Sequence, residues 1–193
     1  WVFTADAVKR ESGDYNVTVD PVSDRLAVSA GETPLADRTQ RNTDVKLETY
    51  GVGLSYIGET GYVGASVRRL ETQYGVPYPQ VVIVGPPPAE GPVYLDLQQT
   101  RYDLRGESDV SLGWFDKARF SVGYADYEHA EVEVATGDVG TRFLSTGTEG
   151  RLELVQAERD GWQGAVGLQG LTREFEAIGD EAFVPPTKIK EVG

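Results

Sequence analysis

Apolar and polar residues alternate along much of this chain, with the two-residue period of a β-strand that has one apolar face. The alternation is clearest in residues 50–56, 62–67, 118–124 and 162–168. No window places apolar residues at helical spacing over several turns. The pattern predicts an all-β fold of about seven strands, over residues 1–10, 45–57, 61–74, 94–107, 116–131, 141–157 and 161–176.

The connections between these segments fall into two classes. Residues 58–61 and 158–161 are expected to be tight turns, and Asp160-Gly161 favours the positive backbone angles of a hairpin. Residues 14–44, 75–92 and 132–140 are longer and rich in Pro, Gly, Asp and Thr. Short turns at one rim and long loops at the other are typical of a transmembrane β-barrel. We therefore expect an antiparallel up-and-down meander that forms a partial transmembrane β-barrel.

The alternation also assigns the two faces of the expected sheet. Apolar positions such as Val52, Val122 and Val166 are expected to face lipid, and the residues between them the lumen. Charged residues then line the lumen on two strands, at Arg101, Asp103, Arg105, Glu149, Arg151 and Glu153. We expect these charges to pair across strands or to contact a domain inside the lumen.

Composition excludes several classes of function. The 193 residues carry a net charge of −13, which argues against a nucleic-acid partner because phosphate binding needs clustered Lys and Arg. With no cysteine and one histidine, the sequence offers no disulfide, thiolate site or multi-histidine metal centre. It shows no Ser-His-acid arrangement and no phosphate-binding loop, so we do not expect an enzyme.

The two ends of the chain suggest an internal fragment of a longer protein. The sequence starts at Trp1 in strand-like residues, without a signal peptide, and stops after Pro185-Pro186 in what resembles the approach to another strand. In lipid, an open sheet edge leaves unpaired backbone groups, at a cost of several kcal/mol each. We therefore do not expect the chain to insert stably alone.

Five stretches resemble TonB-dependent outer-membrane receptors, most closely the subgroup that includes zinc and haem uptake receptors. These stretches are Gln-Tyr-Gly-Val-Pro at 73–77, Asp-Leu-Gln-Gln-Thr-Arg-Tyr-Asp-Leu-Arg-Gly-Glu at 96–107, Gly-Tyr-Ala-Asp-Tyr-Glu-His-Ala-Glu at 123–131, Thr-Glu-Gly-Arg-Leu-Glu-Leu at 148–154 and Glu-Ala-Phe-Val-Pro-Pro-Thr at 181–187. The resemblance covers nearly the whole chain, and the order and spacing of the stretches are more specific than any one of them.

The resemblance implies a receptor in the bacterial outer membrane. Members of this family hold an N-terminal plug inside a barrel of about 22 strands, and import scarce metals or metal chelates with energy passed on by TonB. It implies that residues 1–193 are a partial barrel without plug, TonB box or C-terminal strands. The implied partners are the TonB complex through the missing N-terminal region, the plug and membrane lipid. The implied cargo is zinc, haem or a ferric siderophore, with no cofactor in the fragment itself.

His129 and Glu131 are the candidate metal ligands. They lie two residues apart on one expected strand and project to the same luminal side, near the extracellular end. Imidazole and carboxylate are two ligand types that zinc accepts, but zinc prefers four ligands, so the others would come from the plug or distant loops. The alternative is a solvated histidine in an acidic patch of the rim.

Aromatic residues in the long loops are the candidate substrate contacts. Tyr74, Tyr78 and Phe183 are expected there beside proline clusters. The resemblance implies that such loops trap substrate, and ordinary loop packing is the alternative.

Two other functions stay open. One is a soluble β-sandwich that binds carbohydrate through Trp114, Trp162 and Tyr78. The other is a small outer-membrane barrel that acts as a pore or adhesin, which would need an even strand number and closure.

Overall fold

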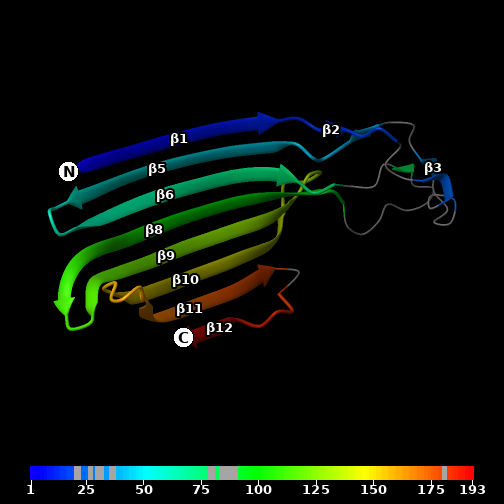
Figure 1. Cartoon of the computed structure of the whole chain (residues 1–193). Helices are drawn as coiled ribbons and strands as arrows, with labels where there is room; N and C mark the ends of the chain where they lie inside the picture. Colours follow the sequence, from blue (N-terminus) through cyan, green and yellow to red (C-terminus); the bar gives the residue numbers. More distant parts are fainter. Residues whose placement is uncertain are drawn as a thin grey trace.

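The computed structural model describes residues 1–19, 23–25, 28, 33–34, 38–77, 81–82, 91–179 and 182–193. Eight strands form one sheet in the order β1-β5-β6-β8-β9-β10-β11-β12 (Figure 1). Their bounds are β1 Val2–Ser12, β5 Val45–Ile57, β6 Gly61–Gly75, β8 Val93–Leu112, β9 Phe115–Glu133, β10 Val139–Gln156, β11 Ala165–Gly179 and β12 Thr187–Val192. All neighbours in this sheet are antiparallel. The predicted all-β antiparallel meander is therefore confirmed.

Four two-residue strands lie in the two long connections. The strand β2 (Tyr15–Asn16) pairs with β4 (Thr39–Gln40), and β3 (Thr33–Pro34) pairs with β7 (Val81–Val82). The β3–β7 pair joins the connection after β1 to the connection after β6. Among the described residues, no helix has the length and apolar character needed to cross a membrane.

The main sheet has one more strand than expected, and several strands are longer. The additional strand is β12, which the sequence indicates only as an approach to a strand. The strand β8 was expected at residues 94–107 and ends instead at Leu112. The strand β9 was expected at residues 116–131 and runs from Phe115 to Glu133. Residues 132–140 were wrongly expected to form a long loop, because β9 continues to Glu133 and β10 begins at Val139.

The tight turns gather at one rim of the sheet, at the left of Figure 1. The turn after β5 is closed by the Gly58 amide, which donates to the Gly61 carbonyl at 2.8 Å. In the β10–β11 connection Arg159 bridges Trp162, and the two residues between them, Asp160 and Gly161, have φ of 52° and 80°. Both central angles are positive, as in the hairpin turn expected from Asp160-Gly161.

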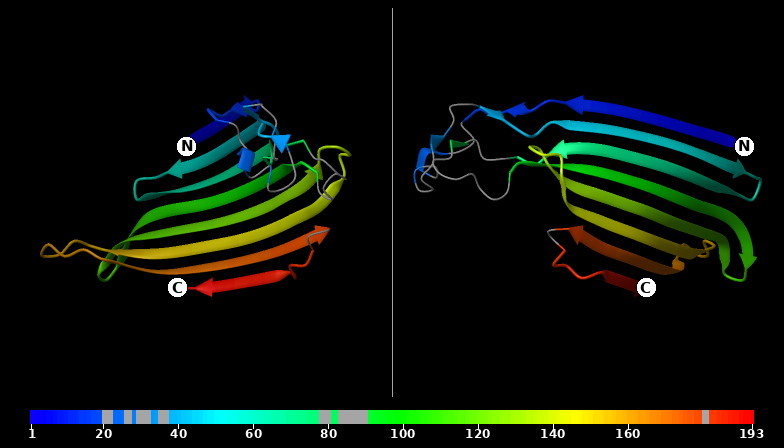
Figure 2. Two further views of the ribbon diagram at one scale, coloured as in Figure 1. Left: turned by 90° about the vertical axis from the view of Figure 1, so that its right-hand side faces the viewer. Right: turned by 180° about the vertical axis from the view of Figure 1, so that it is seen from behind.

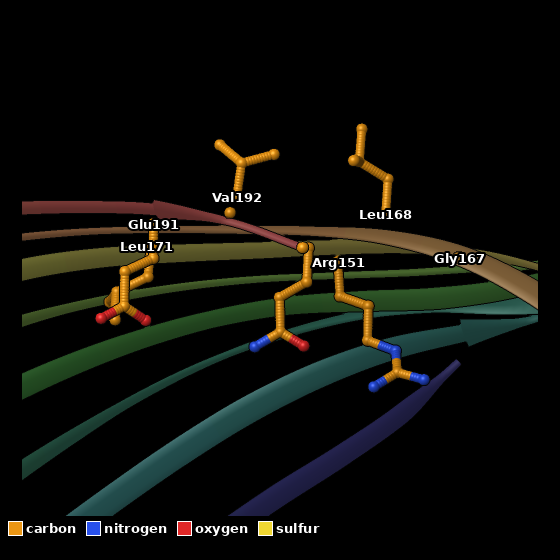
Figure 3. A pocket seen from close by; sticks show the side chains of 9 residues that line it. Arg151, Gly167, Leu168, Leu171, Glu191 and Val192 are labelled. Carbon is orange, nitrogen blue, oxygen red and sulfur yellow. The ribbon is translucent and has the colours of Figure 1, made fainter.

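The two faces of the sheet differ in chemistry. One face, called the outer face below, carries an apolar band that crosses most of the strands. Its members are Phe3, Ala5, Val52, Leu54, Val63, Ala65, Tyr102, Leu104, Phe120, Val122, Leu152, Leu154, Val166 and Leu168. Behind this band, the inner face carries charged residues; on the outer face, charged residues such as Lys9, Glu48 and Glu128 lie beyond the band, towards the long connections. In Figure 3, Leu168 and Val192 point to one side of the sheet, whereas Arg151, Leu171 and Glu191 point to the other, towards which the rest of the sheet bends.

The sheet has almost no buried apolar core. Among the described residues only Val132, Val155 and Ala177 are buried and apolar. In contrast, Val52, Val122 and Val166 are 48%, 44% and 54% exposed. A β-sandwich would cover these valines with a second sheet, and the described residues form no such layer over them (Figure 2).

Pairs of aromatic side chains mark the two ends of the apolar band. On the side of the long connections, Tyr102 and Tyr124 lie on neighbouring strands with 6.2 Å between ring centroids. At the tight-turn rim, the rings of Trp1 and Tyr56 are 5.1 Å apart. Both pairs include residues with strongly exposed rings. The sheet remains open in the described residues, because β1 pairs only with β5 and β12 only with β11.

Candidate functional site

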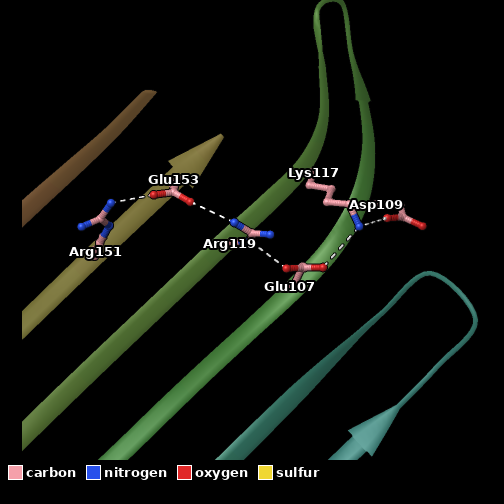
Figure 4. A network of polar contacts seen from close by, with 6 residues as sticks. All are labelled: Glu107, Asp109, Lys117, Arg119, Arg151 and Glu153. Atoms are coloured by element: carbon pink, nitrogen blue, oxygen red, sulfur yellow. Dashed lines mark hydrogen bonds and ion pairs between the residues drawn. The ribbon is translucent and has the colours of Figure 1, made fainter. Parts of the chain in front are cut away.

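A chain of ion pairs crosses three strands on the inner face (Figure 4). Arg119 of β9 donates from Nε to Glu107 Oε2 of β8 at 2.6 Å and from Nη1 to Glu153 Oε1 of β10 at 3.3 Å. Arg151 also donates to Glu153, at 2.6 Å, and Lys117 reaches Glu107 at 3.4 Å. Cross-strand pairing, expected for Glu153 among other charged residues, is thus present on the inner face.

A second cluster joins strands that are not neighbours. Arg101 of β8 donates to Asp103 on its own strand and to Glu149 of β10, across β9. Likewise Arg68 of β6 donates to Asp6 of β1 at 3.0 Å, across β5. Each of these bridges passes over a glycine of the intervening strand, which leaves the necessary space.

These ion pairs are partly exposed to solvent in the isolated sheet. Exposed pairs contribute only about 0–1 kcal/mol each to stability, because water screens them. A body that covered the inner face would remove this screening and strengthen the network. The charges of the two clusters therefore suit a hydrated interior or the surface of a second domain better than a dry core.

An aromatic cluster lies on the inner face nearer to the long connections. The His129 ring stacks on Phe143, with centroids 4.5 Å apart and planes 23° apart, and Phe143 lies 6.1 Å from Phe175. On its own strand, His129 Nδ1 shares a 2.9 Å hydrogen bond with the Tyr127 hydroxyl. The cluster thus spans β9, β10 and β11, and was not predicted from the sequence.

The cluster changes the protonation of its two titratable members. Burial lowers the pKa of His129 below its ordinary value of 6.5. Burial, and to a lesser degree Tyr74, raise the pKa of the Tyr127 hydroxyl. Near neutral pH the imidazole is therefore neutral, which is the form that can bind a metal.

The candidate metal ligands lie on one face, as their spacing predicts. His129 faces Leu97 and Phe143 in the sheet register, and Glu131 faces Leu95 and Thr141 in the next row of that face. Because Nδ1 of His129 is bonded to Tyr127, Nε2 is the nitrogen left for a metal. The described residues contain no group of three or more His, Asp or Glu side chains placed to hold a metal ion. A complete site would need ligands from outside the described residues.

The structure does not bring the two described candidate aromatic contacts, Tyr74 and Phe183, together. Tyr74 lies in β6, not in a loop as expected, because that strand continues to Gly75. Phe183 is an exposed residue of the connection between β11 and β12. Four inter-strand spacings separate β6 from β11, roughly 19 Å across the sheet. Tyr78 lies outside the described residues.

Sequence reasoning missed the partners of His129. Phe143 and Phe175 lie on other strands, and only the register Leu97↔His129↔Phe143 brings the first of them opposite His129. The sequence did contain one signal: the alternation of side chains within each strand places four aromatic residues on the same face, namely Tyr127, His129, Phe143 and Phe175. No protein-family model matches the chain.

Proposed function

We propose that the chain forms part of the wall of a TonB-dependent receptor in the bacterial outer membrane. The receptor binds and imports a scarce metal or metal chelate, namely zinc, haem or a ferric siderophore. One observation carries this proposal: exposed apolar side chains form a band on the outer face, and ion pairs lie behind that band on the inner face. The ion pairs of the outer face, such as Lys9–Glu48 and Arg142–Glu128, lie beyond the band, towards the long connections. A soluble sheet would bury the apolar face, whereas a barrel wall exposes it to lipid.

Lipid contact requires a strand arrangement without free edges. The outer edges of β1 and β12 have unpaired backbone groups in the described residues, which lipid does not satisfy. We infer that further strands of the receptor continue the meander at both edges and close the barrel. The plug domain then occupies the inner face, and TonB acts through a region that precedes the barrel.

The aromatic cluster on the inner face supports a role in cargo binding. His129 offers one imidazole nitrogen beside the flat rings of Phe143 and Phe175. This combination suits a metal ion or a metal chelate with an aromatic surface. Glu131 on the same face would supply a carboxylate.

The membrane part of the proposal is tested by an arginine placed on either face of one strand. Ala65 belongs to the outer apolar band and its neighbour Ser66 faces the interior. Ala65→Arg should lower the amount of folded protein in the outer membrane, because an arginine in the lipid-facing band costs about 2–4 kcal/mol at the midplane. Ser66→Arg, the control, should have a much smaller effect. Equal effects would contradict the assigned lipid face.

The transport part is tested by uptake. Loss of the protein should slow growth under zinc or iron limitation, and inactivation of TonB should abolish the uptake that the protein supports. His129→Ala should weaken zinc binding at least about tenfold in calorimetry if the cargo is zinc, since even supporting residues of metal sites contribute 10–100-fold. Unchanged zinc affinity would leave haem or a siderophore as the cargo.

A small pore-forming or adhesive barrel is the second candidate. The observation in its favour is the even number of eight strands in the main sheet, whose end strands β1 and β12 run in opposite directions (Figure 1). Such strands can pair antiparallel and close a barrel of eight. A disulfide formed within one chain between cysteines introduced at Ala5 and Lys190 would favour this closure over a larger receptor.

A further inference from the structure

In one row of the inner face, a serine lies between two arginines, one on each neighbouring strand. The register pairs Arg105 of β8 with Ser121 of β9, and Ser121 with Arg151 of β10. Two strand spacings separate the arginine backbones, roughly 10 Å. Because the serine side chain is short, the row has a notch between two long cationic side chains.

The notch belongs to a cavity with an excess of positive charge. The cavity has a volume of about 340 Å³, and its charged lining residues are Arg105, Arg119, Arg151, Glu107 and Glu153. Three arginines and two carboxylates give the lining a formal charge of +1, in a chain whose net charge is −13. The cavity is thus a local cationic site on an acidic protein.

The arginines of this cavity differ in how far their donors are used. Arg119 is held between Glu107 and Glu153 by two hydrogen bonds (Figure 4). Arg151 donates through Nη2 to Glu153. Among the residues that the structure describes, no carboxylate lies within ion-pair distance of Arg105. A guanidinium has five N–H donors, so Arg105 and Arg151 both retain donors for a ligand.

We propose that this row is a binding site for a small oxyanion, of phosphate or carboxylate chemistry, held over Ser121 between Arg105 and Arg151. The planar guanidinium fork matches the oxygens of both groups. The Ser121 hydroxyl supplies a third donor at the base of the notch. Glu107 and Glu153 hold the guanidinium group of Arg119 in place at the side of the cavity. The site is argued from inner-face residues of β8, β9 and β10 and not from the proposed transport role.

The site is tested by titrating the intact protein that contains this chain, in detergent micelles, with inorganic phosphate and measuring binding by calorimetry. Wild-type protein should bind phosphate saturably. Arg105→Gln should weaken binding at least about tenfold, because it removes one of the two guanidinium forks that hold the anion. Arg173→Gln is the matched control, since Arg173 lies on the same face but outside this cavity. It should change the affinity less than about twofold.

A second variant separates a defined site from general attraction by charge. Ser121→Val keeps every charge and fills the notch, so it should also weaken phosphate binding, while circular dichroism should show unchanged strand content. Three results would overturn the proposal: no saturable binding to wild-type protein, equal losses in Arg105→Gln and Arg173→Gln, or wild-type affinity in Ser121→Val.

Discussion

Arg101 and Glu149 form an ion pair across a strand to which neither belongs. Nη2 of Arg101 lies 2.7 Å from Oε1 of Glu149, and β9 runs between their strands. Gly123 of β9 makes the contact possible, because a Cβ atom there would stand 2.7 Å from Arg101 Nη2 and 3.1 Å from Glu149 Oε1. A glycine inside a strand normally weakens the strand; here it admits a bridge over it.

The bridge predicts a specific effect of a side chain at position 123. Gly123→Val should displace Arg101 from Glu149 and lower the free energy of unfolding by about 1 kcal/mol, the upper end of what a partly exposed ion pair contributes. Gly150→Val is the matched control, since a Cβ atom at Gly150 would have only one neighbour within 4 Å, at 3.9 Å. It should change the unfolding free energy by less than about 0.5 kcal/mol. Urea unfolding in micelles measures both, and equal losses would contradict the interpretation.

The faces of the sheet could be predicted from the sequence because side-chain direction alternates with a period of two. Whether a residue such as Val52 or Val122 lies at an odd or an even position of its strand is therefore sufficient to assign its face, even when the strand ends are unknown.

The ends of the strands were harder to predict. Residues 106–109, Gly-Glu-Ser-Asp, resemble a turn, yet they continue β8, and Gly106 is covered by the Phe120 ring, whose Cε1 lies 2.6 Å from where a Cβ atom would be.

The sites could be predicted only in part, because they depend on register between strands. The shared face of His129 and Glu131 follows from parity. The stack of His129 on Phe143 requires the length of the β9–β10 connection, which the sequence places at 132–140 and the structure at 134–138. Arg105 and Arg151 are 46 positions apart, and no local pattern indicates that they share a row.

The proposed orientation of the sheet in the outer membrane is tested by cysteine labelling. Thr136 is exposed in the β9–β10 turn, on the side of the long connections, and Thr60 is exposed in the β5–β6 turn at the opposite rim. On whole cells, an impermeant thiol reagent should label Thr136→Cys. It should label Thr60→Cys only after the outer membrane is opened. The reverse pattern would invert the orientation.

The pKa of His129 predicts how stability depends on pH. Because burial lowers this pKa in the folded chain, the unfolded chain binds more protons from the lowered value up to about 6.5. The free energy of unfolding should therefore fall as pH decreases through that window. His129→Phe preserves an aromatic ring on Phe143 and removes the titrating group, so its stability relative to wild type should improve as pH falls.

The control for this titration is Tyr127→Phe, which removes the hydroxyl bonded to Nδ1 and leaves the imidazole in place. Its stability should retain a dependence on pH in the same direction as wild type. Unfolding followed by fluorescence from pH 7.5 to 5 measures all three proteins. A constant difference between wild type and His129→Phe across this range would show that His129 does not titrate with folding.

If the sheet is part of a membrane barrel, as proposed, the tryptophans predict where the membrane surface lies. All three tryptophans of the chain occur at the tight-turn rim: Trp1 before β1, Trp114 between β8 and β9, and Trp162 between β10 and β11. They are 80%, 68% and 78% exposed. Tryptophan concentrates at lipid–water interfaces because its ring is apolar and its N–H is polar.

In reconstituted vesicles, the tryptophan fluorescence of the protein should therefore be quenched more by a nitroxide near the lipid headgroups than by one near the bilayer centre. Val122→Trp places an additional ring inside the apolar band, on the outer face of β9. Its added fluorescence should show the opposite order, with stronger quenching from the bilayer centre. If neither nitroxide quenched either protein, the outer face would not contact lipid. If Val122→Trp showed the same order as wild type, the apolar band would lie at the surface of the bilayer and would not span it.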